Sequence, residues 1–113
     1  MADIVKPPIV CLCGSMRFYE TFMWAMFNET MAGKIVLGPA FFPGIPDSDH
    51  SENVGITPEQ KVFLDELHLR KIELADVVFI LNEDGYIGES TARELEYARS
   101  LGKVIRFLEE ERT

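Results

Sequence analysis

The sequence predicts an α/β three-layer sandwich, in which a mostly parallel sheet of four to five strands carries helices on both faces. Two observations support this prediction. Short apolar runs alternate along the chain with longer segments of helical pattern, as in strands joined by helical crossovers. The run at 77–81, Val-Val-Phe-Ile-Leu, is unbroken and rich in β-branched residues, which is typical of a strand buried on both faces. The expected architecture is Rossmann- or flavodoxin-like.

The first half of this pattern begins with a strand at 8–13. The turn Gly14-Ser15-Met16-Arg17 leads into a helix that runs to about Ala32, where Gly33 ends it. A second strand follows at 34–37.

Residues 38–56 read as a long loop rich in proline and polar residues, which is equally compatible with a binding lid and with a plain connection. The second helix opens at Thr57-Pro58-Glu59-Gln60, where a capping threonine, a proline at the first helical position and a capping-box glutamine stand in order. It is expected to end near Ala75. After the strand at 77–81 come a helix from about Ala92 to Leu101 and a last strand at 104–107.

Composition indicates one domain, residues 1–113. Hydrophobic residues make up 47% of the chain, yet no segment is long and apolar enough to cross a membrane, and no signal peptide is visible. A cytoplasmic location is therefore expected. The formal net charge of -8 argues against binding to a nucleic-acid polymer, which requires a basic surface.

Two loops follow strand ends and enter helices directly, Gly14–Arg17 and Asn82–Thr91. Ligands of parallel α/β folds lie beyond the carboxyl ends of the strands, so both loops should face one crevice. Backbone N–H groups, the Ser15 hydroxyl and the Arg17 guanidinium are suited to a phosphate or carboxylate. The alternative is an ordinary turn in which Ser15 only caps the helix.

Glu94 also has two interpretations. Thr91-Ala92-Arg93-Glu94 fits a capping box, in which the glutamate would reach back to its own helix terminus. Otherwise the carboxylate projects into the crevice as a nucleophile. Local sequence leaves both open.

The two cysteines, Cys11 and Cys13, should point the same way from the first strand and are expected to be buried, inert thiols. A metal site would need further ligands, and His50 and His68 have no zinc-like spacing, so no metal is predicted. For His68 we expect a hydrogen bond at the surface, on the helical face that it shares with Asp65, and the alternative is that it approaches the crevice.

The helix at Phe18–Met31 is rich in methionine and aromatic residues and is apolar on more than one face. A helix of this kind buries a second side, which predicts a homo-oligomer, most simply a dimer.

Three motifs together resemble the nucleoside 2-deoxyribosyltransferase superfamily, which includes nucleoside 5'-monophosphate N-glycosidases. They are Cys13-Gly14-Ser15-Met16-Arg17, Leu74-Ala75-Asp76-Val77-Val78, and Gly88-Glu89-Ser90-Thr91-Ala92-Arg93-Glu94-Leu95-Glu96-Tyr97-Ala98 followed by Gly102-Lys103-Val104. The similarity covers most of the chain from Ile9 to Leu108, apart from the loop at 41–55.

This resemblance implies cleavage of an N-glycosidic bond, by hydrolysis or transfer, without a cofactor. It makes Glu94 the catalytic nucleophile and Asp76 a catalytic residue that engages the sugar. The residues that it implies for substrate binding are Gly14, Ser15, Met16, Arg17, Gly85, Tyr86, Gly88, Ser90 and Thr91. The expected partner is a nucleoside or nucleotide. The alternative is a nucleotide-sensing module of the same fold that performs no chemistry.

The chain departs from the family pattern at two positions. Cys11 stands where many members carry an aromatic hydroxyl near the sugar, and Gly88 stands where transferases place an acid six residues before the nucleophile. Possible substitutes for that acid are Asp84, Tyr86, Glu89 and Ser90.

Overall fold

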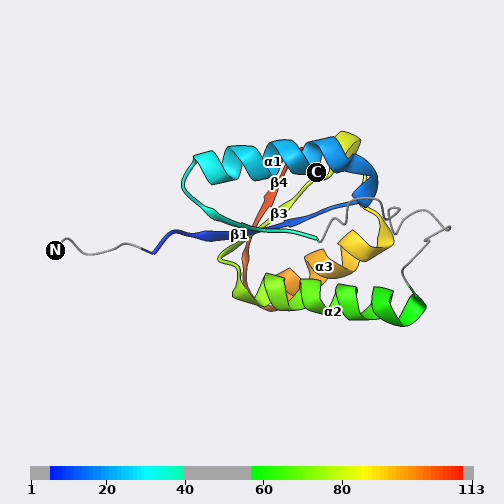
Figure 1. Ribbon diagram of the computed structural model, residues 1–113. Coiled ribbons are helices and arrows are strands. Elements are labelled where there is room, and N and C mark those ends of the chain that lie inside the picture. The colour runs from blue at the N-terminus through cyan, green and yellow to red at the C-terminus, as the bar shows by residue number, and fades with distance from the viewer. Residues whose placement is uncertain (1–5, 40–56, 111–113) are drawn as a thin grey trace.

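Four parallel strands form the sheet of this protein. The structure, a computed structural model, describes residues 6–39 and 57–110. The described strands are β1 (Ile9–Cys13), β2 (Ile35–Leu37), β3 (Val77–Ile80) and β4 (Val104–Phe107). They pair in the order β2-β1-β3-β4, all parallel (Figure 1). The predicted parallel sheet is confirmed, with four strands.

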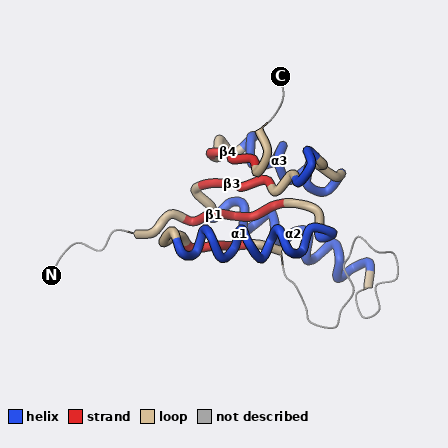
Figure 2. Tube along the Cα trace, turned by 90° about the horizontal axis from the view of Figure 1, so that it is seen from above, coloured by secondary structure: helices blue, strands red, loops and turns tan. Residues whose placement is uncertain are grey.

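Helices cover both faces of this sheet, as predicted. Helix α1 (Tyr19–Met31) lies on one face, and α2 (Pro58–Leu74) and α3 (Glu89–Ser100) lie on the other (Figure 1). Seen from above, β1, β3 and β4 follow one another between these layers (Figure 2). The fold is therefore Rossmann-like. Within residues 6–39 and 57–110, no helix has the length and apolar character needed to cross a membrane.

The core divides into two apolar clusters, one on each face of the sheet. Alternate side chains of β1 supply both, because successive residues of a strand point to opposite faces. The cluster under α1 contains Val10, Leu12, Phe22, Ala25, Phe79 and Leu81. The cluster under α2 and α3 contains Cys11, Cys13, Ile72, Ala75, Val78, Ile80, Leu95 and Ala98. The expectation that both cysteines are buried on one face is confirmed.

Local signals in the sequence place several helix ends correctly. Thr57 caps α2 by accepting a hydrogen bond from the Gln60 backbone at 3.1 Å, and the Gln60 side chain accepts one from the Thr57 backbone at 2.9 Å. Gly33 and Gly102 follow α1 and α3 with φ of 88° and 72°, a left-handed conformation that glycine adopts without a steric penalty.

Two predicted boundaries are wrong. The first helix does not run directly from the turn, because a short 3-10 helix η1 (Met16–Phe18) comes before α1. The last helix begins at Glu89 rather than near Ala92. The long loop predicted at 38–56 falls on residues 40–56, which lie outside the described part.

A charged residue on the inner face of α1 links that helix to the sheet. Glu29 is buried, and its carboxylate accepts hydrogen bonds from Arg106 on β4 at 2.6 Å and from Lys34 at 2.9 Å. Arg106 also lies 4.2 Å from the ring centroid of Phe79. The hydrogen bond from Arg106 holds the pKa of the Glu29 carboxyl below its usual 4.5. The carboxylate is therefore ionised at neutral pH and ties α1 to β4.

We expect Glu29→Gln to lower the free energy of unfolding by about 1–3 kcal/mol at neutral pH, since two cations lose their counter-charge. Arg106 is 40% exposed, so water screens part of this loss. The folded-state pKa is lowered, so the carboxylate stabilises the fold above pH 4.5 and this contribution is lost as the pH falls through the folded-state value. Urea unfolding at a series of pH values should show the difference shrinking below pH 4.5.

The matched control for this prediction is Glu66→Gln, whose side chain is 62% exposed beside Arg70 and whose loss should change stability by less than about 0.5 kcal/mol. A wild-type to Glu29→Gln difference that does not depend on pH would contradict the prediction.

Candidate functional site

The order of the strands identifies the position at which folds of this kind bind ligands. The chain leaves β1 toward β2 on one side and leaves β3 toward β4 on the other, so the direction of winding reverses between β1 and β3. Ligands of such sheets bind at this reversal, beyond the carboxyl ends of the strands. Cys13 and Ile80 are paired at these ends, and the loops that follow them are the two predicted from the sequence.

The turn after β1 is tightly packed. A Cβ atom at Gly14 would lie 3.1 Å from the Leu81 carbonyl oxygen and 3.3 Å from Cζ of Phe22. Ser15 then caps the 3-10 helix, its hydroxyl accepting a hydrogen bond from the Arg17 backbone at 3.3 Å. Ser15 therefore caps this short helix, which is compatible with either interpretation of the turn. Met16 is half-buried and the Arg17 side chain is exposed.

The loop after β3 contacts this turn through an aromatic side chain. Arg17 donates a hydrogen bond from Nη2 to the Tyr86 hydroxyl at 3.2 Å, and its guanidinium lies 4.3 Å from the centroid of the Tyr86 ring. Phe18 packs edge-on against the same ring, with centroids 5.9 Å apart. The structure therefore brings together the two predicted binding loops, as expected from the fold.

The rest of this loop is shaped by a tight turn and an amide anchor. Gly85 has φ of 79°, which favours glycine, and Asp84 before it has φ of 56°. The buried Asn82 side chain donates to the Glu109 carbonyl at 2.9 Å and accepts from the Glu109 backbone N–H at 3.0 Å. This pair fixes the loop to the chain segment beyond β4.

Helix α3 starts at Glu89, with Gly88 as its N-cap. Thr91 and Glu94 therefore lie inside the helix, and the capping-box interpretation of these two residues is wrong. Thr91 is buried, whereas the Ser90 hydroxyl accepts a hydrogen bond from Arg93 at 3.3 Å. The carboxylate of Glu94 is thus free of a capping role.

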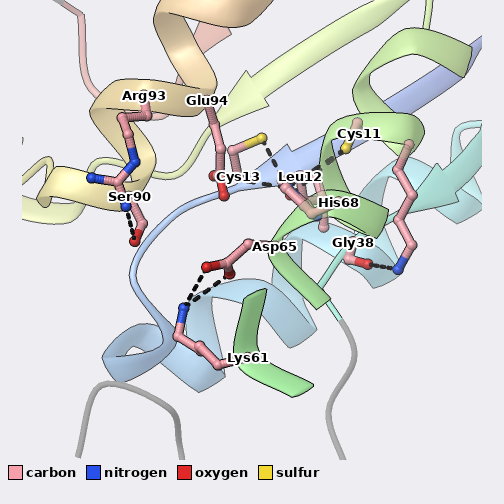
Figure 3. Close-up of polar contacts among 11 residues, drawn as sticks. Cys11, Leu12, Cys13, Gly38, Lys61, Asp65, His68, Ser90, Arg93 and Glu94 are labelled. Atoms are coloured by element: carbon pink, nitrogen blue, oxygen red, sulfur yellow. Dashed lines mark hydrogen bonds and ion pairs between the residues drawn. The ribbon is translucent and has the colours of Figure 1, made fainter. Parts of the chain in front are cut away.

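Glu94 belongs instead to a compact polar cluster under α2 and α3, which we call the Cys-His-Glu cluster and which consists of Cys11, Cys13, His68 and Glu94. The Nε2 atom of His68 lies 3.3 Å from Sγ of Cys13, 4.0 Å from Sγ of Cys11 and 3.8 Å from Oε1 of Glu94. Figure 3 shows the side chains of β1, α2 and α3 converging on this imidazole. The cluster lies at the carboxyl end of β1.

Burial increases from one side of the cluster to the other. Both thiols are fully buried, the His68 side chain is 8% exposed and the Glu94 side chain is 17% exposed. Glu94 is therefore the member that solvent or a ligand meets first. Among the described residues, Nδ1 of His68 is a buried nitrogen that has no hydrogen-bond partner. Such a group costs about 1–3 kcal/mol and is uncommon in a core kept only for packing.

Electrostatic coupling divides the charges within the cluster. Burial raises the pKa of the Glu94 carboxyl above 4.5, against the opposing effect of positive charge on His68. Burial disfavours protonation of His68, but the hydrogen bond with Cys11 and the charge on Glu94 outweigh it and raise the pKa above 6.5.

The two thiols shift in opposite directions. The hydrogen bond from Cys13 lowers the pKa of Cys11 to about 6 although burial opposes this, while that same hydrogen bond and burial raise the pKa of Cys13 well above its usual range. Of the two thiols, Cys11 is therefore the one that loses its proton more readily.

Asp76, which the sequence analysis predicted as a site residue, lies apart from the other predicted site residues. It directly precedes β3, where its carboxylate accepts a hydrogen bond from the Ile9 backbone at 2.8 Å, and its own N–H donates to the Ile9 carbonyl at 2.8 Å. This position is at the amino ends of β1 and β3, across the sheet from Cys13 and Glu94. Its visible role is to anchor the start of β1.

His68 is the residue of the cluster that the sequence analysis misplaced. The expected surface hydrogen bond is wrong, because the side chain points into the core while Asp65 pairs with Lys61 at 2.9 Å. The only available signal was Cys11 and Cys13 pointing the same way from a strand. No sequence spacing relates them to a histidine 55 positions further along the chain.

Comparison with known proteins finds no matching family model and no curated protein with a matching sequence. The chemistry of the site is therefore argued from its geometry. A largely buried carboxylate beside an imidazole is suited to stabilise positive charge on a ligand, and the exposed guanidinium of Arg17 is suited to bind an anionic group.

The packing of the first turn yields a stability prediction. Gly14→Ala should lower the free energy of unfolding by about 1–3 kcal/mol, because the added methyl group overpacks against Leu81 and Phe22. Gly38→Ala is the matched control, since its Cβ would meet Leu12 at an ordinary 3.9 Å. Urea unfolding of both variants tests this, and equal stabilities would show that the turn tolerates a side chain.

Proposed function

We propose that the protein cleaves the N-glycosidic bond of a nucleoside or nucleoside 5'-monophosphate, with Glu94 as the nucleophile. The observation that carries the proposal is the Glu94 carboxylate itself, which is largely buried, takes no part in capping α3 and lies at the solvent side of the Cys-His-Glu cluster. The resemblance of the three sequence motifs to the nucleoside 2-deoxyribosyltransferase superfamily supports the same reaction.

The mechanism follows from the charge that this reaction develops. As the bond to the base breaks, positive charge builds on the sugar ring, and a carboxylate close to the anomeric carbon stabilises that charge and bonds to the carbon. Water releases the sugar in a hydrolase, and a second base captures it in a transferase. His68, 3.8 Å from the carboxylate, holds Glu94 in position.

Binding of a 5'-phosphate is assigned to the turn after β1. Arg17 is exposed at its end, and its present hydrogen-bond acceptor is the neutral hydroxyl of Tyr86. A phosphate offers the guanidinium a charged, bidentate partner, and this binding energy orients the sugar against the nucleophile. Tyr86 and the N-terminal turn of α3, with Ser90, complete the proposed crevice. Asp76 is left out of this mechanism because it lies at the opposite edge of the sheet.

We expect Glu94→Gln to reduce base release by about a hundredfold or more, since the amide neither bonds to the anomeric carbon nor carries charge. The assay is chromatographic detection of free base from ribo- and deoxyribonucleoside 5'-monophosphates and from unphosphorylated nucleosides. Glu96→Gln is the control, because that side chain lies on the same helix but is 74% exposed and paired with Arg99.

Three outcomes of this assay are informative. Release that is lost in Glu94→Gln and retained in Glu96→Gln supports the proposal, and addition of a second base then separates transfer from hydrolysis. Equal release by the wild type and Glu94→Gln contradicts the nucleophile. Thermal stabilisation by a nucleotide without any base release indicates a sensing module instead.

We further infer that the protein is a homodimer built on the outer face of α1. That face points away from the sheet (Figure 1) and carries large apolar side chains in the open, with Trp24 66%, Phe27 57% and Met31 71% exposed. Trp24 and Phe27 pack edge-on and, with Glu20 and Met23, line an open hollow. Exposed apolar surface of this kind is typical of an interface between copies, and a two-fold axis pairs the patch with itself.

Light scattering at micromolar concentration should give about twice the chain mass of 12.8 kDa. Trp24→Glu should convert the protein to a monomer, because it introduces a like charge at the centre of a self-paired patch. Val62→Glu, at a 63% exposed position on α2, should leave the dimer intact. A monomeric wild type would refute this assembly.

The two reduced thiols and the enzyme class proposed here favour a cytoplasmic location.

A further inference from the structure

We propose that the Cys-His-Glu cluster binds a thiophilic divalent metal ion such as Zn²⁺. The proposed ligands are Cys11, Cys13, His68 and Glu94. The inference does not rest on the proposed cleavage reaction, although both use Glu94, because it is argued from the geometry and ligand chemistry of the cluster alone.

Three of the four donor atoms form a group close to the size that such an ion requires, and the fourth lies beside it. Zn–S distances near 2.3 Å and Zn–N distances near 2.0–2.1 Å place the ligands of a tetrahedral zinc ion about 3.3–3.8 Å from one another. From Nε2 of His68, Sγ of Cys13 lies 3.3 Å away, Oε1 of Glu94 3.8 Å and Sγ of Cys11 4.0 Å. The two sulfurs and the imidazole nitrogen all lie within 4.8 Å of one another. The two sulfurs and the imidazole nitrogen would have to draw closer together around the ion, and Glu94, which lies next to Nε2, is the side chain placed to supply a fourth ligand.

The chemistry of the donors selects the class of ion. Thiolate and imidazole ligands favour zinc and its soft relatives, whereas magnesium and calcium require oxygen ligands. A carboxylate in the fourth position is compatible with zinc. Two sulfurs, one nitrogen and one oxygen thus point to Zn²⁺, with Co²⁺ as a spectroscopic substitute.

The orientation of His68 is compatible with coordination of a metal ion. The imidazole directs Nε2 at both sulfurs and at the carboxylate (Figure 3), while Nδ1 has no partner within the described residues that would fix the ring tautomer. Nε2 can therefore present its lone pair to a cation. Access is available from the Glu94 side, because that side chain is 17% exposed.

The four proposed ligands come from three elements of regular secondary structure. Cys11 and Cys13 are held on β1, one of the two inner strands of the sheet, and His68 and Glu94 on helices α2 and α3. Sites built on strands and helices keep their geometry better than sites on loops. Bound metal would also link α2 and α3 to the sheet.

The test is a titration of the full chain, reduced and freed of metal, with Co²⁺. We expect a thiolate-to-cobalt charge-transfer band and the visible bands of tetrahedral cobalt, saturating at about one equivalent per chain and bleached by Zn²⁺. Absence of the charge-transfer band overturns the proposal without reference to any catalytic assay.

Variants assign the ligands. The double variant Cys11→Ser and Cys13→Ser should lose the charge-transfer band, and His68→Gln should weaken Co²⁺ binding by at least about tenfold. Asp65→Asn is the control, since this carboxylate lies on α2 near His68 but points to Lys61 and should not affect affinity. A band that persists unchanged in the double cysteine variant would place the metal elsewhere and refute the site. Circular dichroism verifies that each variant is folded, and the wild-type titration decides the matter if one is not.

Discussion

The rest of the molecule depends on the enclosure of strand β1. It is hydrogen-bonded to a neighbouring strand along both edges and covered by helices on both faces. Each of its side chains therefore packs against a particular helix layer. Val10 and Leu12 pack under α1, whereas Cys11 and Cys13 face α2 and α3. The chain leaves this enclosed strand at Gly14, where an added Cβ atom would lie only 3.1 Å from the carbonyl oxygen of Leu81. Packing of the core thus sets both the first loop of the crevice and the two sulfurs beside it.

Features that depend on neighbours in sequence were predictable. Three such features are each encoded within a few residues. They are the alternation of side-chain direction along β1, the capping box at Thr57 and the glycine that ends α1. The start of α3 was not, because its cap is Gly88, which has no side chain to signal it, while Thr91 and Glu94 mimic a capping box inside the helix.

The position of His68 was beyond local inference for a different reason. Helix α2 exposes Val62, Phe63 and Leu67 and buries His68, so its apolar and polar residues are not segregated by face. The rotation of the helix is instead set by contacts of Ile72 and Ala75 with the sheet. Long-range packing thereby places His68 beside Cys13 and Cys11, which are 55 and 57 positions away in sequence.

Glu94 is where the two proposals meet. A carboxylate that bonds to a sugar carbon needs a free electron pair, and a carboxylate that coordinates a metal ion has donated one. The cation and the sugar would therefore compete for the carboxylate of Glu94, which lies on the exposed side of the cluster. The buried sulfurs would bind only the cation. The double variant Cys11→Ser and Cys13→Ser should remove this competition while Glu94 remains on α3 beside His68, although the carboxylate then loses its hydrogen bond with the Cys13 thiol. If both proposals hold, cleavage depends on Glu94 and metal binding depends on the sulfurs as well, so substitutions can separate the two.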